Sequence, residues 1–182
     1  PINPAGSPDD AILNSIESAL DKSLAELNQD TSPVRQLRRI NEASRFFEDS
    51  IASHINAHPD FTCEYPQLAS GKVQRSGYPD LQITHLPSNR VCYLDPKLFE
   101  ASSRKSTLRT FYYQPRTRYT KIHHDAHHIL AGIEHDGRDG NWKFTGWKIV
   151  DLAELKLSLK AEFYGSNRDI YRDELLLRHS KR

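Results

Sequence analysis

The chain has 182 residues, of which 37% are hydrophobic and 27% are charged, and its formal net charge is +1. This length is enough to bury a sizeable core in one domain, and no apolar run approaches the roughly 20 residues that a membrane-spanning helix needs. The two cysteines argue against a disulfide framework, so we expect a reducing, cytoplasmic location with no membrane partner.

Charged residues are distributed unevenly along the chain. Residues 1–64 carry eleven Asp or Glu against five Lys or Arg. Residues 101–124, which we call the basic segment, carry six Lys or Arg and no acidic residue. A polyanionic partner would explain such a separation of charge.

The first two predicted elements are helices. Ser7 as N-cap and Pro8 at the first helical position form a start signal. The apolar residues that follow recur at helical spacing: Ile12, Leu13, Ile16, Ala19, Leu20, Leu24 and Leu27. A second start signal, Ser32-Pro33, predicts a helix that continues to residue 55, with Glu48 on the border of its apolar stripe.

Strands are predicted for most of the remaining chain. A short strand at 61–65 is followed by a basic loop at 69–77 and by a hairpin within 76–100, in which we place Leu86 opposite Val91. After the basic segment, two further strands, 127–135 and 142–150, flank a Gly/Asp turn. A helix is predicted over 151–164. The sequence therefore predicts an α/β domain with a central mixed β-sheet flanked by α-helices.

The predicted hairpin brings four polar side chains together. In this register Asp80 faces Lys97, and Gln82 faces Asp95. Since side chains alternate along a strand, all four share one face, while the apolar residues of both strands share the other. Two carboxylates this close repel one another unless a cation lies between them. A hard divalent ion such as Mg²⁺ suits such a set of oxygen ligands.

This arrangement resembles the PD-(D/E)xK nuclease superfamily. Pro79-Asp80 is followed, after fourteen intervening residues, by Asp95-Pro96-Lys97 at the end of an apolar strand. Members commonly add a glutamate from the helix before the sheet, and Glu48 is the matching position. The resemblance covers roughly residues 32–152. It implies a restriction-endonuclease-like core and Mg²⁺-dependent hydrolysis of phosphodiester bonds in double-stranded DNA, as in type II restriction enzymes.

The resemblance also implies a role for each site residue. Asp80, Asp95 and the Pro96 carbonyl would hold Mg²⁺, with Mn²⁺ as an alternative ion, and Lys97 would act at the attacking water. Glu48 would be a further catalytic residue. Gln82 would be accessory through its place on the hairpin face. Pro96 departs from the commoner apolar residue at its position, but its carbonyl remains available.

Alternative interpretations of the same residues stay open at this point. The hairpin charges could be ordinary strand-end charges, and Glu154-Leu155-Lys156 also matches the second half of the motif. A repair-type nicking nuclease on the same core is one alternative function. A non-catalytic DNA-binding or metal-binding protein is another.

Basic residues supply the predicted DNA-binding surface, since Lys and Arg bind backbone phosphates. The alternative is an amphipathic helix with a solvated face, which accounts poorly for the missing acids. The predicted DNA contacts are Lys72, Arg75, Arg104, Lys105, Arg109, Arg116, Arg118 and Lys121.

The histidines of "HHDAHH" (123–128) form a second cluster. His123 and His127 are four residues apart, so on a helix they would offer two imidazoles for zinc. A surface cluster or a set of contacts to DNA phosphates is the alternative.

The whole chain, 1–182, is expected to form a single nuclease domain. Residues 1–31 would be an N-terminal helix used in dimerisation, 32–152 the catalytic core, and 153–182 a C-terminal helix and tail. A homodimer would let each subunit cut one DNA strand.

Overall fold

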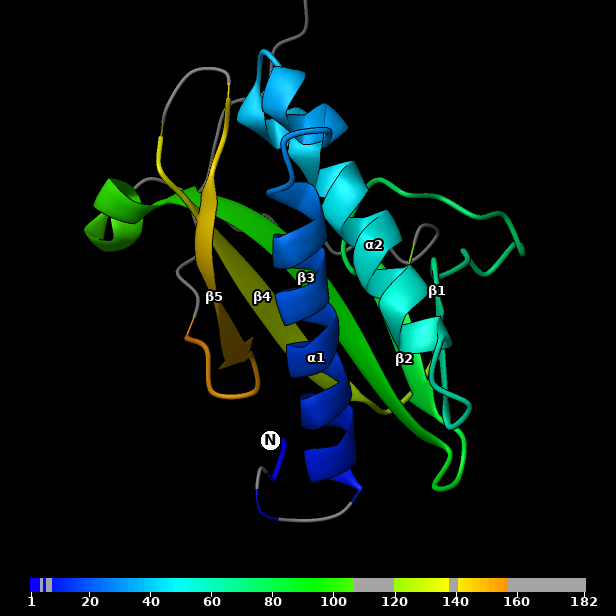
Figure 1. Cartoon of the computed structure of the whole chain (residues 1–182). Helices are drawn as coiled ribbons and strands as arrows, with labels where there is room; N and C mark the ends of the chain where they lie inside the picture. The colour runs from blue at the N-terminus through cyan, green and yellow to red at the C-terminus, as the bar shows by residue number, and fades with distance from the viewer. Residues whose placement is uncertain (4, 6–7, 107–119, 138–140, 157–182) are drawn as a thin grey trace, which may run out of the picture.

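Five strands form one mixed sheet in the computed structural model, which describes residues 1–3, 5, 8–106, 120–137 and 141–156 (Figure 1). Their order across the sheet follows the chain: β1 Phe61–Glu64, β2 Leu81–His85, β3 Arg90–Glu100, β4 His127–His135 and β5 Phe144–Asp151. β3 and β4 are parallel, and all other neighbours are antiparallel. The predicted α/β class with a mixed sheet is confirmed.

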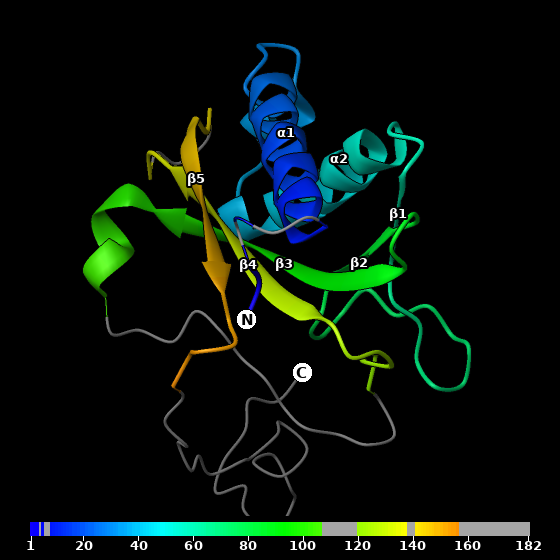
Figure 2. The ribbon, with the colours of Figure 1, turned by 90° about the horizontal axis from the view of Figure 1, so that it is seen from below.

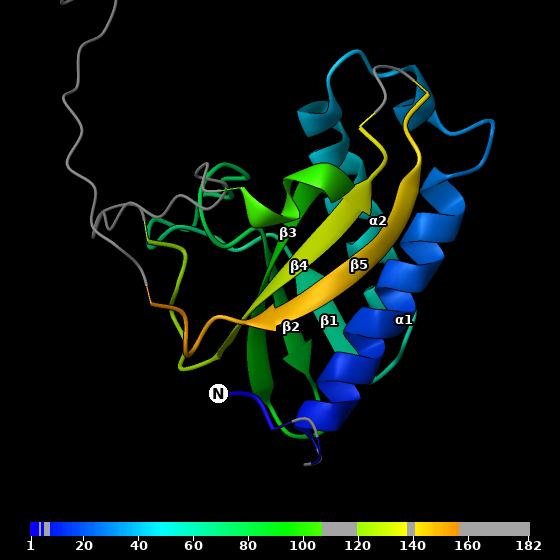
Figure 3. The same cartoon turned by 90° about the vertical axis from the view of Figure 1, so that its left-hand side faces the viewer.

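Two helices cover one face of this sheet, as the views in Figures 2 and 3 show. They are α1, Asp9–Leu27, and α2, Ser44–Asn56. Their apolar stripes are buried against the sheet, and the Phe47 ring meets Phe144 of β5 edge-on at 4.6 Å. Burying one such side chain contributes about 1.5–3 kcal/mol. This packing explains why the helical spacing of apolar residues predicted α1 and the second half of the second helix.

The second predicted helix is interrupted, which corrects the expectation for residues 32–43. This stretch forms two short 3₁₀ helices, Pro33–Gln36 and Ile40–Ala43, separated by extended backbone at Leu37. Trp142 Nε1 donates a 2.8 Å hydrogen bond to the Leu37 carbonyl, and the Asn141 amide donates to the Arg35 carbonyl at 2.8 Å. These carbonyls are therefore bonded to the residues before β5 and not to the next turn of a helix.

The hairpin is formed with a register two residues away from the predicted one. Thr84, and not Leu86, pairs with Val91. Leu86 lies in the turn, which ends at Asn89 with a φ of 53°, a left-handed conformation that asparagine tolerates well. A shift of two residues keeps every side chain on its predicted face.

Other element ends also differ from expectation. α1 begins at Asp9 with Pro8 at the N-cap position, one residue later than predicted, and Ser7 lies outside the described residues. Asp151 ends β5 opposite Ile129, and 152–156 are not helical, so pairing with β4 overrides the helix predicted from residue 151. The rest of that helix, from residue 157, is not among the described residues.

Within the described part of the chain, no helix combines the length and apolar character needed to cross a membrane.

Candidate active site

Lys97 of β3 lies between two carboxylates, those of Asp80 and Asp95. Its Nζ atom is 3.1 Å from Asp80 Oδ2 and 2.6 Å from Asp95 Oδ2. Leu81 pairs with Leu94, so continuing this register by one residue places Asp80 beside Asp95, and not opposite Lys97 as predicted. The long lysine side chain nevertheless reaches both acids from the next position on the same face.

Asp95 is the most deeply buried member of this group, with 1% of its surface exposed. Burial, reinforced by the negative charge of Asp80, raises the pKa of Asp95 to about 7, although the neighbouring ammonium of Lys97 opposes the shift. For Lys97 itself, burial disfavours the charged form, but Asp95 and Asp80 outweigh it and raise the pKa of the lysine.

Helix α2 brings Glu48 to the same place. Burial and the charge of Asp80 raise the pKa of Glu48 to about 7, while Arg75 opposes this shift. Arg75 Nε is 3.7 Å from Glu48 Oε2, and the same guanidinium contacts Asp49 and lies 4.0 Å above the Tyr65 ring. The contacts with Asp49 and Tyr65 thus hold Arg75 beside Glu48.

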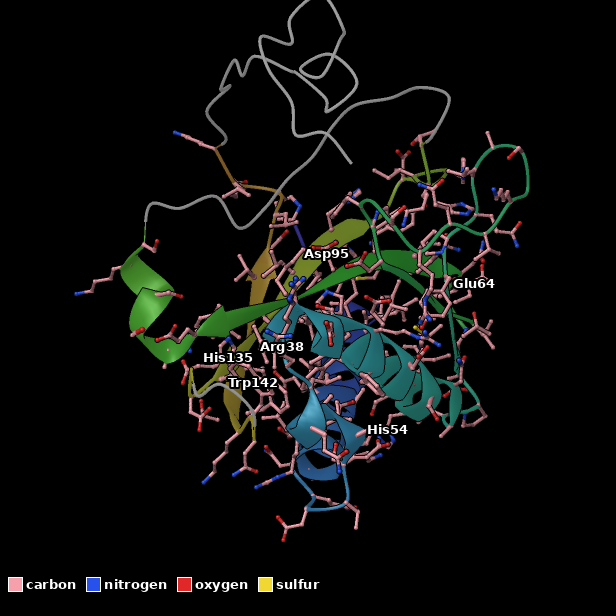
Figure 4. The ribbon with its side chains drawn as sticks, turned by 90° about the horizontal axis from the view of Figure 1, so that it is seen from above. Arg38, His54, Glu64, Asp95, His135 and Trp142 are labelled. Carbon is pink, nitrogen blue, oxygen red and sulfur yellow. The ribbon has the colours of Figure 1, made fainter. Side chains whose placement is uncertain are left out.

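Two other predicted site residues lie on the same strands. Pro96 is buried in β3, opposite Ala131 of β4. Gln82 shares the face of Asp80, but its amide donates to Glu64 Oε1 at 3.5 Å, toward the outer strand β1. Figure 4 shows Asp95 near the middle of the molecule and Glu64 near the β1 edge. The structure therefore brings Glu48, Asp80, Asp95 and Lys97 together and leaves the amide of Gln82 outside this group.

The chemistry of this group fits a divalent cation. Carboxylate and carbonyl oxygens are the ligands that Mg²⁺ prefers. The buried Oδ2 atom of Asp95 lies 2.6 Å from Lys97 Nζ, but the two atoms do not form a hydrogen bond of good geometry. Burial, with the charge of Asp80, raises the pKa values of Asp95 and Glu48, so a cation bound beside them would favour their charged forms. Among the described residues no three His, Cys, Asp or Glu side chains are arranged to enclose an ion, and the cation between Asp80 and Asp95 is the lysine ammonium.

Comparison with known proteins identifies the family of this chain. The model of the type II restriction enzyme MjaV family matches residues 1–174. The type II restriction enzyme MjaV of Methanocaldococcus jannaschii is 30% identical over 189 aligned residues, which cover 97% of this chain and 80% of that protein. The chain belongs to the MjaV family of type II restriction enzymes. It is therefore an endodeoxyribonuclease that acts at specific DNA sequences, and the resemblance to restriction endonucleases is confirmed.

The basic residues predicted to bind DNA fall into distinct environments in this MjaV-family enzyme. Lys72 and Lys105 are exposed, whereas Arg75 is half-buried in its contacts with Glu48 and Asp49. Lys121 is 1% exposed, so it does not lie on the surface as a phosphate contact would require. Arg109, Arg116 and Arg118 lie outside the described residues, as does the side chain of Arg104.

The histidine cluster does not form the helix that would place His123 and His127 on one face. Residues 123–126 are irregular, and His127 and His128 begin β4. His123 Nε2 is 2.9 Å from the Gln67 carbonyl, His127 Nε2 is 3.2 Å from Asp9 Oδ1, and His128 Nδ1 is 2.6 Å from the Tyr78 hydroxyl. Each of these three imidazoles thus has a different partner.

Sequence reasoning missed two features of the site. Arg75 was assigned to DNA but contacts Glu48. Lys121 was also assigned to DNA, yet it is buried near the carboxylates. One feature of the sequence could have indicated that Lys121 is buried. It lies near the end of the basic segment, next to Ile122 and the strand that follows, and a buried residue is more common there than within a solvated run.

Proposed function

We propose that this enzyme is a Mg²⁺-dependent restriction endonuclease of the PD-(D/E)xK type, with Glu48, Asp80, Asp95 and Lys97 as its active site. One observation carries the proposal: Lys97 Nζ lies 3.1 Å from Asp80 and 2.6 Å from Asp95 on one sheet face. Two carboxylates and a lysine at this separation are the chemical set that phosphodiester hydrolysis needs, because the reaction requires charge neutralisation and an oriented water.

Asp80, Asp95 and the Pro96 carbonyl would hold the ion, with Mn²⁺ as an alternative to Mg²⁺. When bound, the ion supplies positive charge for the reacting phosphate and makes water a better nucleophile. Asp95 is buried within β3, and Asp80 directly precedes β2 and contacts Lys97, so the sheet holds both carboxylates close together. This placement favours a fixed geometry for cleavage.

Lys97 would orient the attacking water and share in balancing charge on the phosphate. About a third of its side chain, 35%, is exposed, so its ammonium can reach a substrate while it contacts Asp80 and Asp95. Glu48 would complete the site from α2, and Arg75 would hold the Glu48 carboxylate in place.

We further propose that the enzyme acts as a homodimer. The described residues contain one such cluster per chain, and cutting both strands of a duplex in one binding event needs two. The apolar stripe of α1 is buried within its own chain, so a dimer contact through residues 1–31 would use the exposed, polar side of this helix.

Cleavage of plasmid DNA of known sequence tests the proposal. The protein is incubated with the plasmid in Mg²⁺, in Mn²⁺ and in EDTA, and the ends of the products are sequenced. Discrete fragments that appear only with a divalent ion support the proposal and give the recognition sequence. Nicked circles would indicate a nicking enzyme, and the absence of cutting under all conditions would indicate DNA binding alone.

A further inference from the structure

Lys121 is a buried lysine that the proposed mechanism does not use. Its side chain lies on the segment that precedes β4, and only 1% of its surface is exposed. Its Nζ atom donates a 3.2 Å hydrogen bond to the Gln74 carbonyl, in the loop that leads to Asp80. A buried ammonium is costly unless opposite charges lie nearby.

The charges that act on Lys121 are those of the candidate active site. Burial lowers the pKa of Lys121, while Asp80, Asp95 and Glu48 favour its charged form and Lys97 opposes it. All three carboxylates of the cluster therefore lie within electrostatic range of this one ammonium.

The neighbours of Lys121 hold it in this position. The His123 amide donates to the Tyr93 hydroxyl at 2.9 Å, and His123 Nε2 lies 2.9 Å from the Gln67 carbonyl. Tyr93 is buried on β3, two residues before Asp95 and on the same face. Together with the bond to Gln74, these contacts fix the segment across the strand that carries the site.

We propose that Lys121 is a positioning residue for DNA cleavage, which acts through the carboxylate cluster by adding a second fixed positive charge beside Lys97. This inference rests on the proposed function of that cluster. A fixed positive charge weakens the binding of a divalent cation to the carboxylates, and it favours a phosphate whose negative charge increases during the reaction. Lys121 would thus lower ion affinity and raise the cleavage rate.

Replacement of Lys121 tests both effects in the full chain. Lys121→Met removes the charge, Lys121→Gln removes the charge but keeps a donor for the Gln74 carbonyl, and Lys143→Met removes an exposed charge just before β5 as the matched control. Binding is measured by calorimetric titration with Ca²⁺ alone, and cleavage is measured with Mg²⁺ under single turnover. We expect both Lys121 variants to bind Ca²⁺ about tenfold more tightly than wild type and to cut at least about tenfold more slowly.

The outcomes separate this inference from the proposed function. If wild type binds Ca²⁺ and cuts DNA, but Lys121→Gln matches it in both, the inference is wrong and the active-site proposal stands. If Lys121→Gln cuts slowly with unchanged Ca²⁺ affinity, Lys121 has only a structural role, and the inference is also wrong. If wild type binds no divalent ion and does not cut, both proposals fail. Lys121→Gln decides the question if Lys121→Met does not fold.

Discussion

Replacing Lys97 by glutamine removes the positive charge between Asp80 and Asp95 while keeping a side chain of similar length. In the wild type its Nζ atom is 3.1 Å from one carboxylate and 2.6 Å from the other. After the change these two acids face one another without a cation. We expect opposite effects on cleavage and on metal binding, because the ammonium helps the reaction but repels a divalent ion.

The size of each effect follows from the geometry. Removing one partner of a buried ion pair costs about 3–5 kcal/mol of folding free energy. Since 35% of the Lys97 side chain is exposed, solvent screening should reduce this to about 1–2 kcal/mol without a divalent ion. Cleavage should fall by about 10²–10⁴-fold, the usual range for loss of a group that assists proton transfer. Affinity for Ca²⁺ should equal or exceed that of wild type.

Three measurements check this prediction. Urea unfolding with EDTA and with Ca²⁺ gives the stability, and Ca²⁺ should recover most of the loss because it replaces the missing positive charge. Single-turnover cleavage with Mg²⁺ gives the rate. Lys148→Gln is the matched control, since Lys148 lies 3.4 Å from Glu134 with 41% of its side chain exposed. The control should cut as wild type does.

A Lys97→Gln variant that cuts at the wild-type rate would refute the role assigned to this lysine. Glu154 and Lys156, both exposed after β5, would then be the acid and lysine to test. A stability loss that Ca²⁺ does not recover would refute the electrostatic part of the reasoning.

Three further predictions concern the acids and the basic segment. Asp80→Ala and Asp95→Ala should each abolish cleavage but retain folding and much of the DNA binding, as measured by gel shift and circular dichroism; a variant that cuts normally would contradict the assignment. Exchanging Arg116 and Arg118 for Ala should lower the slope of log affinity against log salt by about 0.9 for each lost phosphate contact, and an unchanged slope would show that neither touches the backbone. In EDTA, Glu48 and Asp95 of the folded protein keep their protons up to about pH 7, whereas their reference pKa values are 4.5 and 3.8. Between those values and pH 7 the unfolded state therefore binds fewer protons than the folded state. The free energy of unfolding should thus fall as the pH rises across that window. Urea unfolding across this window should show that Glu48→Gln reduces the fall by about 1–3 kcal/mol, and an identical profile would contradict the raised pKa of Glu48.

The placement of several candidate site residues could be predicted from residue spacing, whereas their proposed roles came from the resemblance to nucleases. The separation of Asp80 from Asp95 and Lys97, together with strand alternation, placed all three on one face, and the structure has them there. The helical stripe placed Glu48 at its border, and in the structure the charges of Asp80 and Lys97 act on this carboxylate. These inferences worked because they depend only on the repeat of a strand or a helix, which is local.

The sequence by itself determined the α/β class, the start and end of β4 and which side chains of the hairpin share a face, since each depends on local periodicity and burial. Tertiary structure decided what depends on distant partners. The break at Leu37 depends on a hydrogen bond from Trp142, 105 residues away. The hairpin register, by contrast, depends on the local turn that ends at Asn89, whose length alternation of side chains does not reveal. The burial of Lys121 near the carboxylates likewise depends on a contact with Gln74, 47 residues away, because periodicity along the chain carries no information about which segments meet in space.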